Sequence, residues 1–196
     1  MSRAIRPRHR IAPIEFHAEP PPFMTLPAHV ALIATLTERL RAGPSATAVL
    51  EAWCAARGLS RAELRAERLP GPETAPTDAQ RHRLALTGDA PSRHRRVRLV
   101  CGPHVLSIAD NWYVAARLTP AMNHALAETD VPFGRVVHAL APMRRTLAVR
   151  TLYAAAAPPS AAAPLFSIAA LLATPDGVPF CEVEEVYLGA VLGGTV

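Results

Sequence analysis

The segment Cys181-Glu-Val-Glu-Glu-Val-Tyr-Leu188 interleaves three glutamates with apolar residues. Successive side chains of a strand point to opposite faces, so Glu185 shares a face with Cys181, Val183 and Tyr187. If that face is buried, Glu185 is a carboxylate among apolar neighbours, which is costly unless it is paired or held neutral. The same pattern also fits a strand exposed on both faces, with Glu185 solvated.

A second candidate is the basic strand that runs from Arg95 to Cys101. Alternation places Arg95 on the face of Val97 and Leu99, where a guanidinium can grip a carboxylate through two parallel hydrogen bonds. Read alone, the run more often indicates an ordinary solvated basic strand. An inward arginine and an inward Glu185 on two strands of one sheet would together bracket a small polar ligand.

Other residues with chemical potential lack the spacing that a site needs. His104, His124 and His138 show no metal-ligand pattern, and three sparse cysteines show no zinc or redox pattern. There is no glycine-rich phosphate loop. We therefore expect no metal and no cofactor. The stretch from 111 to 113, Asn-Trp-Tyr, fits either a ligand wall or a packing cluster.

The elements that must position these residues are helices first and strands later. Helical spacing or capping signals predict helices over 28–42, 45–57, 61–68, 119 onward and 134–140, and a loop over 70–92. Period-two patterns predict strands over 95–101, 105–113, 146–153, 168–173 and 180–188, the last two as a hairpin about Pro175-Asp176-Gly177. This order predicts an α+β fold: a single antiparallel sheet with helices packed on one face.

Composition narrows the class of protein. The chain has 196 residues, 50% of them hydrophobic, which favours one domain, predicted here for 28–196 after a flexible arm over 1–27. The net charge is +5, but the arginines are dispersed and only 5% of residues are aromatic, so we expect no nucleic-acid partner. No apolar run reaches the roughly 20 residues of a membrane span. We expect a cytoplasmic protein that binds a small anion and no membrane; the oligomeric state is left open.

Four short motifs resemble the chorismate lyase (chorismate pyruvate-lyase) family. They are Arg95-Arg-Val-Arg-Leu-Val-Cys-Gly102, Ala109-Asp-Asn111, Val131-Pro-Phe-Gly-Arg135 and Glu185-Val-Tyr-Leu188, in the family's order, within a match from about residue 28 to the end. Phe133 stands where the family usually has leucine. The resemblance implies an antiparallel sheet with helices on one face and an enclosed ligand pocket.

The resemblance also implies a carbon–oxygen lyase that eliminates pyruvate from chorismate, a cyclohexadienyl acid, to give the aromatic acid 4-hydroxybenzoate. Arg95 would bind the ring carboxylate, or Arg96 if the match is aligned on Cys101-Gly102. Glu185 would orient the ring hydroxyl, and the backbone at Phe133 and Gly134 would contact the ligand. Arg145 is a further candidate for the second carboxylate. The alternative is a non-catalytic, effector-sensing domain of the same fold that binds an aromatic acid.

Overall fold

The computed structural model describes residues 27–43 and 45–193, so the predicted arm, except Pro27, lies outside the described residues. The centre of the fold is one antiparallel sheet of six strands in the order β1-β2-β3-β6-β5-β4. The strands are β1 Leu64–Arg68, β2 Arg93–Cys101, β3 His104–Tyr113, β4 Met143–Thr151, β5 Pro164–Ala173 and β6 Pro179–Leu188. The predicted fold class is confirmed, with every strand pair antiparallel.

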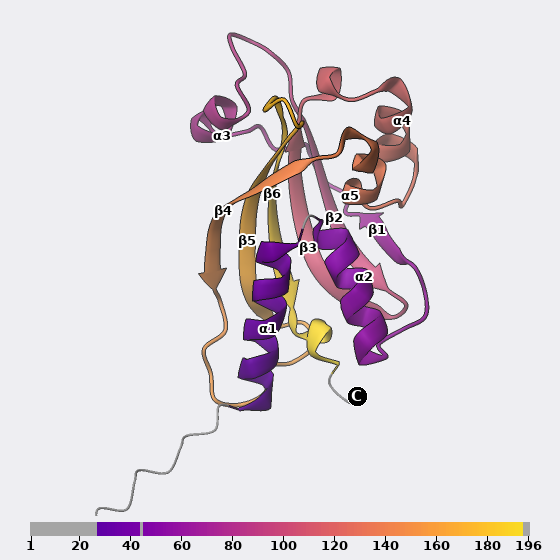
Figure 1. Ribbon diagram of the computed structural model, residues 1–196, viewed down its shortest axis with the longest axis vertical. Helices are drawn as coiled ribbons and strands as arrows, with labels where there is room; N and C mark the ends of the chain where they lie inside the picture. Colours follow the sequence, from indigo (N-terminus) through magenta and orange to yellow (C-terminus); the bar gives the residue numbers. More distant parts are fainter. Residues whose placement is uncertain (1–26, 44, 194–196) are drawn as a thin grey trace, which may run out of the picture.

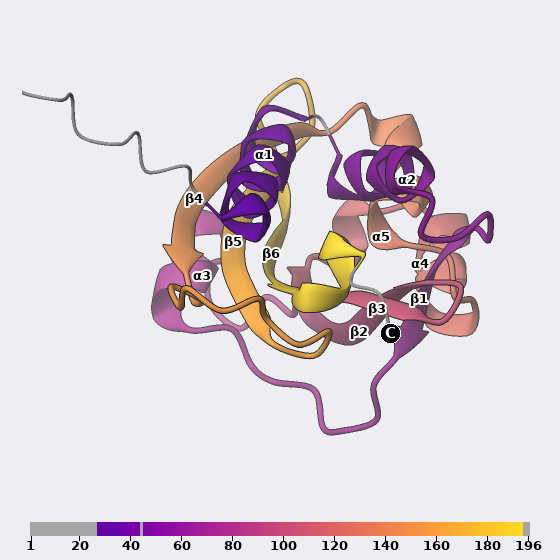
Figure 2. The same cartoon turned by 90° about the horizontal axis from the view of Figure 1, so that it is seen from below.

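Two helices cover one face of the sheet, which curls around them (Figures 1 and 2). These are α1 Ala28–Ala42 and α2 Ala46–Arg57, and the 3-10 turn η3 Gly189–Leu192 lies beside them. Leu36 and Leu40 are completely buried there. The indole Nε1 of Trp53 donates to the carbonyl of Val191 at 2.7 Å, so α2 is tied to η3, the turn that follows β6.

A second group of helices closes one end of the same face (Figure 1). It contains α4 Pro120–Glu128, α5 Phe133–Val136 and the 3-10 turn η2 His138–Leu140. As predicted, Thr119 caps α4 and Pro120 occupies its first position. Apolar residues of these helices pack on Tyr113 and Phe180 at the ends of their strands.

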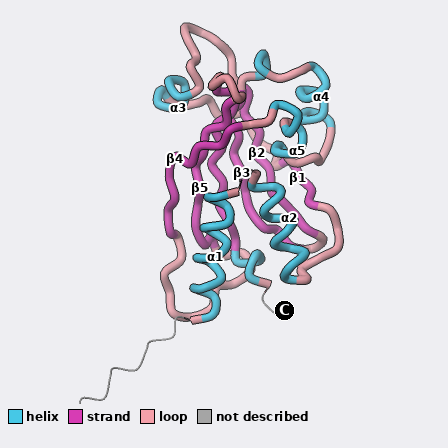
Figure 3. Tube along the Cα trace, in the orientation of Figure 1, coloured by secondary structure: helices cyan, strands magenta, loops and turns pink. Residues whose placement is uncertain are grey.

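The long connection between β1 and β2 contains a short helix, α3 Asp78–Arg83, where the sequence predicts only a loop (Figure 3). Thr77 and Gln80 form a reciprocal capping box, which satisfies backbone groups of so short a helix. The helix lies on the sheet face opposite α1 and α2, where Leu84 packs with Trp112 and Leu171. The helices are therefore confined to one face except for α3.

The segment 61–68, predicted as a helix, forms no helix, and its residues Leu64–Arg68 are instead the edge strand β1. Its alternation decides this, because Leu64 and Ala66 are buried while Glu63 and Arg65 beside them are exposed. All five of its residues pair with β2, and Arg98 of β2 donates to Glu67 at 2.7 Å across the pair. Tertiary pairing overrides a weak local helix preference here.

Among the helices of the described residues, none has the length and apolar character that crossing a bilayer demands.

Candidate functional site

A cavity of about 430 Å³ lies between the inner sheet face and helices α2 and α5. Its walls are mainly apolar; they include Val97, Leu99, Ala109, Phe133, Val137, Leu172 and Val183. A small number of polar side chains interrupts this lining, chiefly Asn111, Arg144 and Glu185. Apolar walls with a few placed polar groups are typical of small-molecule sites.

Glu185 lies on the inner face of β6 and is only 5% exposed. Register places it beside Ala109 of β3 and Ile168 of β5, both buried. Its carboxylate accepts hydrogen bonds from Ser107 Oγ at 2.5 Å and from Tyr187 OH at 2.9 Å. The alternative of a solvated Glu185 therefore does not hold.

Burial raises the pKa of the Glu185 carboxyl. Hydrogen bonds from Ser107 and Tyr187, together with the positive charge of Arg144, act in the opposite direction and offset part of the rise. Glu185 is therefore a carboxyl group whose charged form is supported by neighbours but penalised by its surroundings.

Of the two adjacent arginines on β4, Arg144 and not Arg145 lines this cavity. Arg144 Nη1 donates to the carbonyl of Leu40 at 2.9 Å, which links β4 to the end of α1. Arg145 is the next residue of the strand, points to the other face and is exposed. The choice of Arg145 is thus corrected to its neighbour, because strand register, which the sequence does not show, decides which of two adjacent arginines faces inward.

Phe133 and Gly134 line the cavity at the start of α5. A Cβ at Gly134 would lie 2.8 Å from Thr47 Oγ1 and 2.9 Å from Ser45 Oγ. The missing side chain therefore lets α5 approach the first turn of α2 and close this side of the cavity.

Arg95 lies on the inner face, as alternation predicts, and is 4% exposed. However, it lines a different cavity from Glu185, on the side of α4. Its Nη2 donates to the carbonyls of Thr129 and Val131 at 3.3 and 3.4 Å. Arg96 points to the opposite face, with its side chain 55% exposed. The expected bracketing of one ligand by Arg95 and Glu185 is therefore not what the structure shows.

Three further polar residues line the Glu185 cavity without a signal in the sequence that predicts it. Thr47 and Glu51 come from α2, and His138 comes from the turn after α5. Position in the sequence does not reveal them, because helices far apart along the chain meet only in the fold. Asn111 was proposed as a ligand wall and does line this cavity, whereas Trp112 lies on the other face.

Glu185→Gln should stabilise the protein at neutral pH and leave its stability unchanged near pH 4. Because the folded pKa is raised, the unfolded chain loses this proton first, above its usual pKa of about 4.3. Wild-type stability then falls as pH rises through the folded pKa, by about 1.4 kcal/mol for each unit of pKa difference. Glutamine cannot ionise and escapes this loss.

Urea unfolding of both proteins across this pH range measures the difference. Glu184→Gln is the matched control, since that side chain is 46% exposed on the opposite face. A stability difference between Glu185→Gln and wild type that does not change with pH would contradict the prediction.

Comparison with known proteins gives one close relative and a distant fold likeness. No protein-family model matches the sequence. Over 180 residues the chain is 36% identical to the uncharacterized protein y4mC of Sinorhizobium fredii, covering 83% of this chain and 76% of that protein. The chain belongs to the y4mC family.

The fold of this y4mC family member resembles that of PhnF from Mycobacterium smegmatis. The TM-score is 0.53 at 14% identity, and the match covers 74% of this chain and 64% of PhnF. The chain thus spans less than two thirds of the length of PhnF. Against the isolated effector domain of PhnF the TM-score is 0.51 at 15% identity, covering 75% of this chain and 90% of that domain.

The predicted lyase activity is wrong. The architecture that this y4mC family member shares is that of a protein domain described as an effector domain, not as an enzyme. The chorismate lyase resemblance therefore holds for the fold alone. The two residues expected to carry the reaction, Arg95 and Glu185, also line separate cavities.

Proposed function

We propose that this domain is a non-catalytic effector-binding domain that takes a small aromatic acid into the Glu185 cavity. The observation that carries the proposal is the cavity itself, which is apolar on most sides and has the buried carboxylate of Glu185 and the guanidinium of Arg144 in its lining. A second arginine of the lining, Arg135, is already paired with Glu51. An apolar ring would contact Phe133 and Val183. The likeness to the effector domain of PhnF supports a binding role over a catalytic one.

Two polar groups would orient the ligand. The acid group would pair with Arg144, because a guanidinium forms strong, charge-assisted hydrogen bonds with a carboxylate. A hydroxyl on the ring would donate to Glu185, whose oxygens already accept from Ser107 and Tyr187 and have lone pairs to spare. The ligand class is thus a hydroxylated aromatic acid.

Ligand occupancy would be read out through α2. Arg135, at the edge of the cavity, forms an ion pair with Glu51 of α2 and a longer one with Glu63 at 3.4 Å. The far half of α2 is tied to η3 by Trp53. A ligand that shifts α2 would therefore also shift η3, which follows β6. A ligand that binds one position of α2 better than another would in this way change the conformation without any reaction.

Calorimetric titration with 4-hydroxybenzoate, 3-hydroxybenzoate and benzoate tests the proposal. We expect saturable binding, weakened about 10- to 100-fold in Arg144→Gln, the loss expected for one charge-assisted hydrogen bond. Arg145→Gln removes the same charge from the adjacent, exposed position and should leave affinity unchanged.

Binding of none of the three acids would refute the proposal. It would equally fail if Arg145→Gln weakened binding as much as Arg144→Gln, because the effect would then come from overall charge. Thermal unfolding of each variant shows whether the fold is kept.

A further inference from the structure

The cleft that Arg95 lines is separate from the Glu185 cavity and larger, about 780 Å³. It lies between the end of β1, the loop that follows, the start of β2 and helix α4. Three arginines of the inner side line it, Arg68, Arg93 and Arg95, against a single carboxylate, Glu73. Arg96 also borders the cleft, but its side chain points to the opposite sheet face. This excess of positive charge favours an anionic occupant.

Arg95 lines this cleft with hydrogen-bond donors that lack acceptors. Its Nε and Nη1 are buried and have no hydrogen-bond partner among the residues that the structure describes. The two bonds of Nη2, to Thr129 and Val131, are long and go to neutral carbonyls. Burying such donors unpaired is costly, so an anion that accepts from them would remove a penalty.

Other charges add to the positive field at the same place. Burial lowers the pKa of the Arg95 guanidinium, and the positive charge of Arg68 lowers it further, while Tyr113 and Asp130 act in the opposite direction to a smaller extent. At Tyr113, burial raises the pKa of the hydroxyl and Glu73 adds to the rise, while Arg93, Arg95 and Arg68 all act to lower it. Three guanidiniums therefore lie near one phenol at the wall of the cleft.

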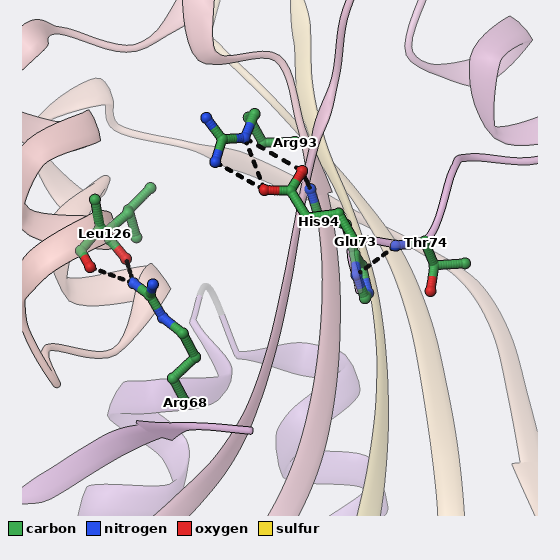
Figure 4. A network of polar contacts seen from close by, with 7 residues as sticks. Arg68, Glu73, Thr74, Arg93, His94 and Leu126 are labelled. Atoms are coloured by element: carbon green, nitrogen blue, oxygen red, sulfur yellow. Dashed lines mark hydrogen bonds and ion pairs between the residues drawn. The ribbon is translucent and has the colours of Figure 1, made fainter. Parts of the chain in front are cut away.

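The walls that carry these arginines are held in place by their own contacts (Figure 4). Arg68 Nη2 donates to the carbonyl of Leu126 at 2.8 Å, near the end of α4. Arg93 donates to Glu73 through Nε and Nη2, and the backbone N–H of Thr74 donates to His94 Nδ1 at 3.0 Å. The cleft is therefore formed before any ligand enters.

An unpaired acceptor lies in the same cleft. Asn123 Nδ2 donates to the carbonyl of Ala115 at 2.9 Å, which fixes the orientation of the amide. Its Oδ1 is buried and without a partner in the described part of the chain. A ligand that fits both orphan groups presents anionic oxygens to Arg95 and a hydroxyl donor to Asn123.

We propose that this cleft is a second ligand site, which binds the dianionic phosphate of a small, hydroxylated phosphate monoester. Arg93 is already paired with Glu73, and a single carboxylate would offset only one of the two further positive charges, Arg95 and its neighbour Arg68. A phosphate offers two negative charges and several acceptor oxygens to the same donors. The site is independent of the proposed aromatic-acid cavity, since Glu185 and Arg144 do not line it.

Thermal unfolding of the full chain in inorganic phosphate and in glycerol 3-phosphate, at constant ionic strength held with chloride, tests this site. We expect a saturable rise in Tm, of about 5–10 °C at a ligand concentration about 100 times Kd. Arg95→Met should abolish the rise. Without ligand this variant should be as stable as wild type or more so, because it removes a buried, unpaired charge.

Arg98→Met is the matched control, because Arg98 lies on the same strand but on the other face and pairs with Glu67. It should keep the full response, as should Glu185→Gln, which separates this site from the first. Should Arg95→Met fail to fold, Arg93→Gln replaces it, with a loss of affinity of about threefold. An equal response to chloride, or an unchanged response in the Arg95 or Arg93 variant, would overturn the proposal.

Discussion

Tyr187→Ala is expected to destabilise the protein by about 3–5 kcal/mol, which is a large share of the stability of an ordinary domain. The Tyr187 ring is completely buried and stacks on Phe166 of β5, with ring centroids 4.7 Å apart. Its removal leaves a cavity against α1 and α2 and takes one hydrogen-bond donor from Glu185. Urea unfolding at constant pH measures the loss.

Tyr187→Phe separates the two contributions. It keeps the stacked ring and removes only the hydroxyl that donates to Glu185, so we expect a smaller loss of about 1–3 kcal/mol. A Phe variant as unstable as the Ala variant would mean that the hydrogen bond to Glu185, and not packing, carries the effect of Tyr187. That result would mean that the hydrogen bonds among Ser107, Glu185 and Tyr187 contribute more to the stability of the core than the packing of the Tyr187 ring does.

Arg83→Ala should destabilise the protein by about 2–4 kcal/mol through a different mechanism, because it leaves a buried carboxylate without its partner. Glu182 is 4% exposed on the outer face of β6. Arg83 holds it with two parallel bonds, Nε to Oε2 and Nη2 to Oε1, both 2.7 Å. Without Arg83 the carboxylate stays buried beneath α3 with no cation beside it.

Two controls identify the mechanism. Adding Glu182→Gln to Arg83→Ala should restore part of the stability, because the orphaned charge is gone. Arg41→Ala breaks an exposed pair with Glu38, 50% and 68% exposed, and should cost only about 0.5 kcal/mol. If the double variant is no more stable than Arg83→Ala, charge burial is not the cause.

Much of the sheet could be predicted because its signal is local. Period-two alternation and turn residues are visible in any sequence window, and they place β2, β3 and the β5–β6 hairpin within a few residues of the observed bounds. Where the local signal is short, it fails. The segment 61–68 follows a helix-capping signal, but its residues Leu64–Arg68 form a strand, because they pair with β2.

The candidate site, too, could be predicted from the sequence only in part. Alternation by itself placed Arg95 and Glu185 on the inner face, since the face of a strand residue depends only on its neighbours in the chain. Whether the two share a cavity depends on where α4 and α5 pack, and Phe133 packs against Tyr113 in a layer between α5 and the sheet. That contact joins residues 20 positions apart in the sequence, and no local pattern contains it.

By itself the amino-acid sequence determined the fold class, the strand faces and the candidate charges of this protein, because these follow from periodicity along the chain. Only the tertiary structure decided that Arg144 and not Arg145 faces the Glu185 cavity, and that Arg95 belongs to a second cleft. The physical reason is that cavities form between elements distant in sequence, and their walls are chosen by register and helix packing.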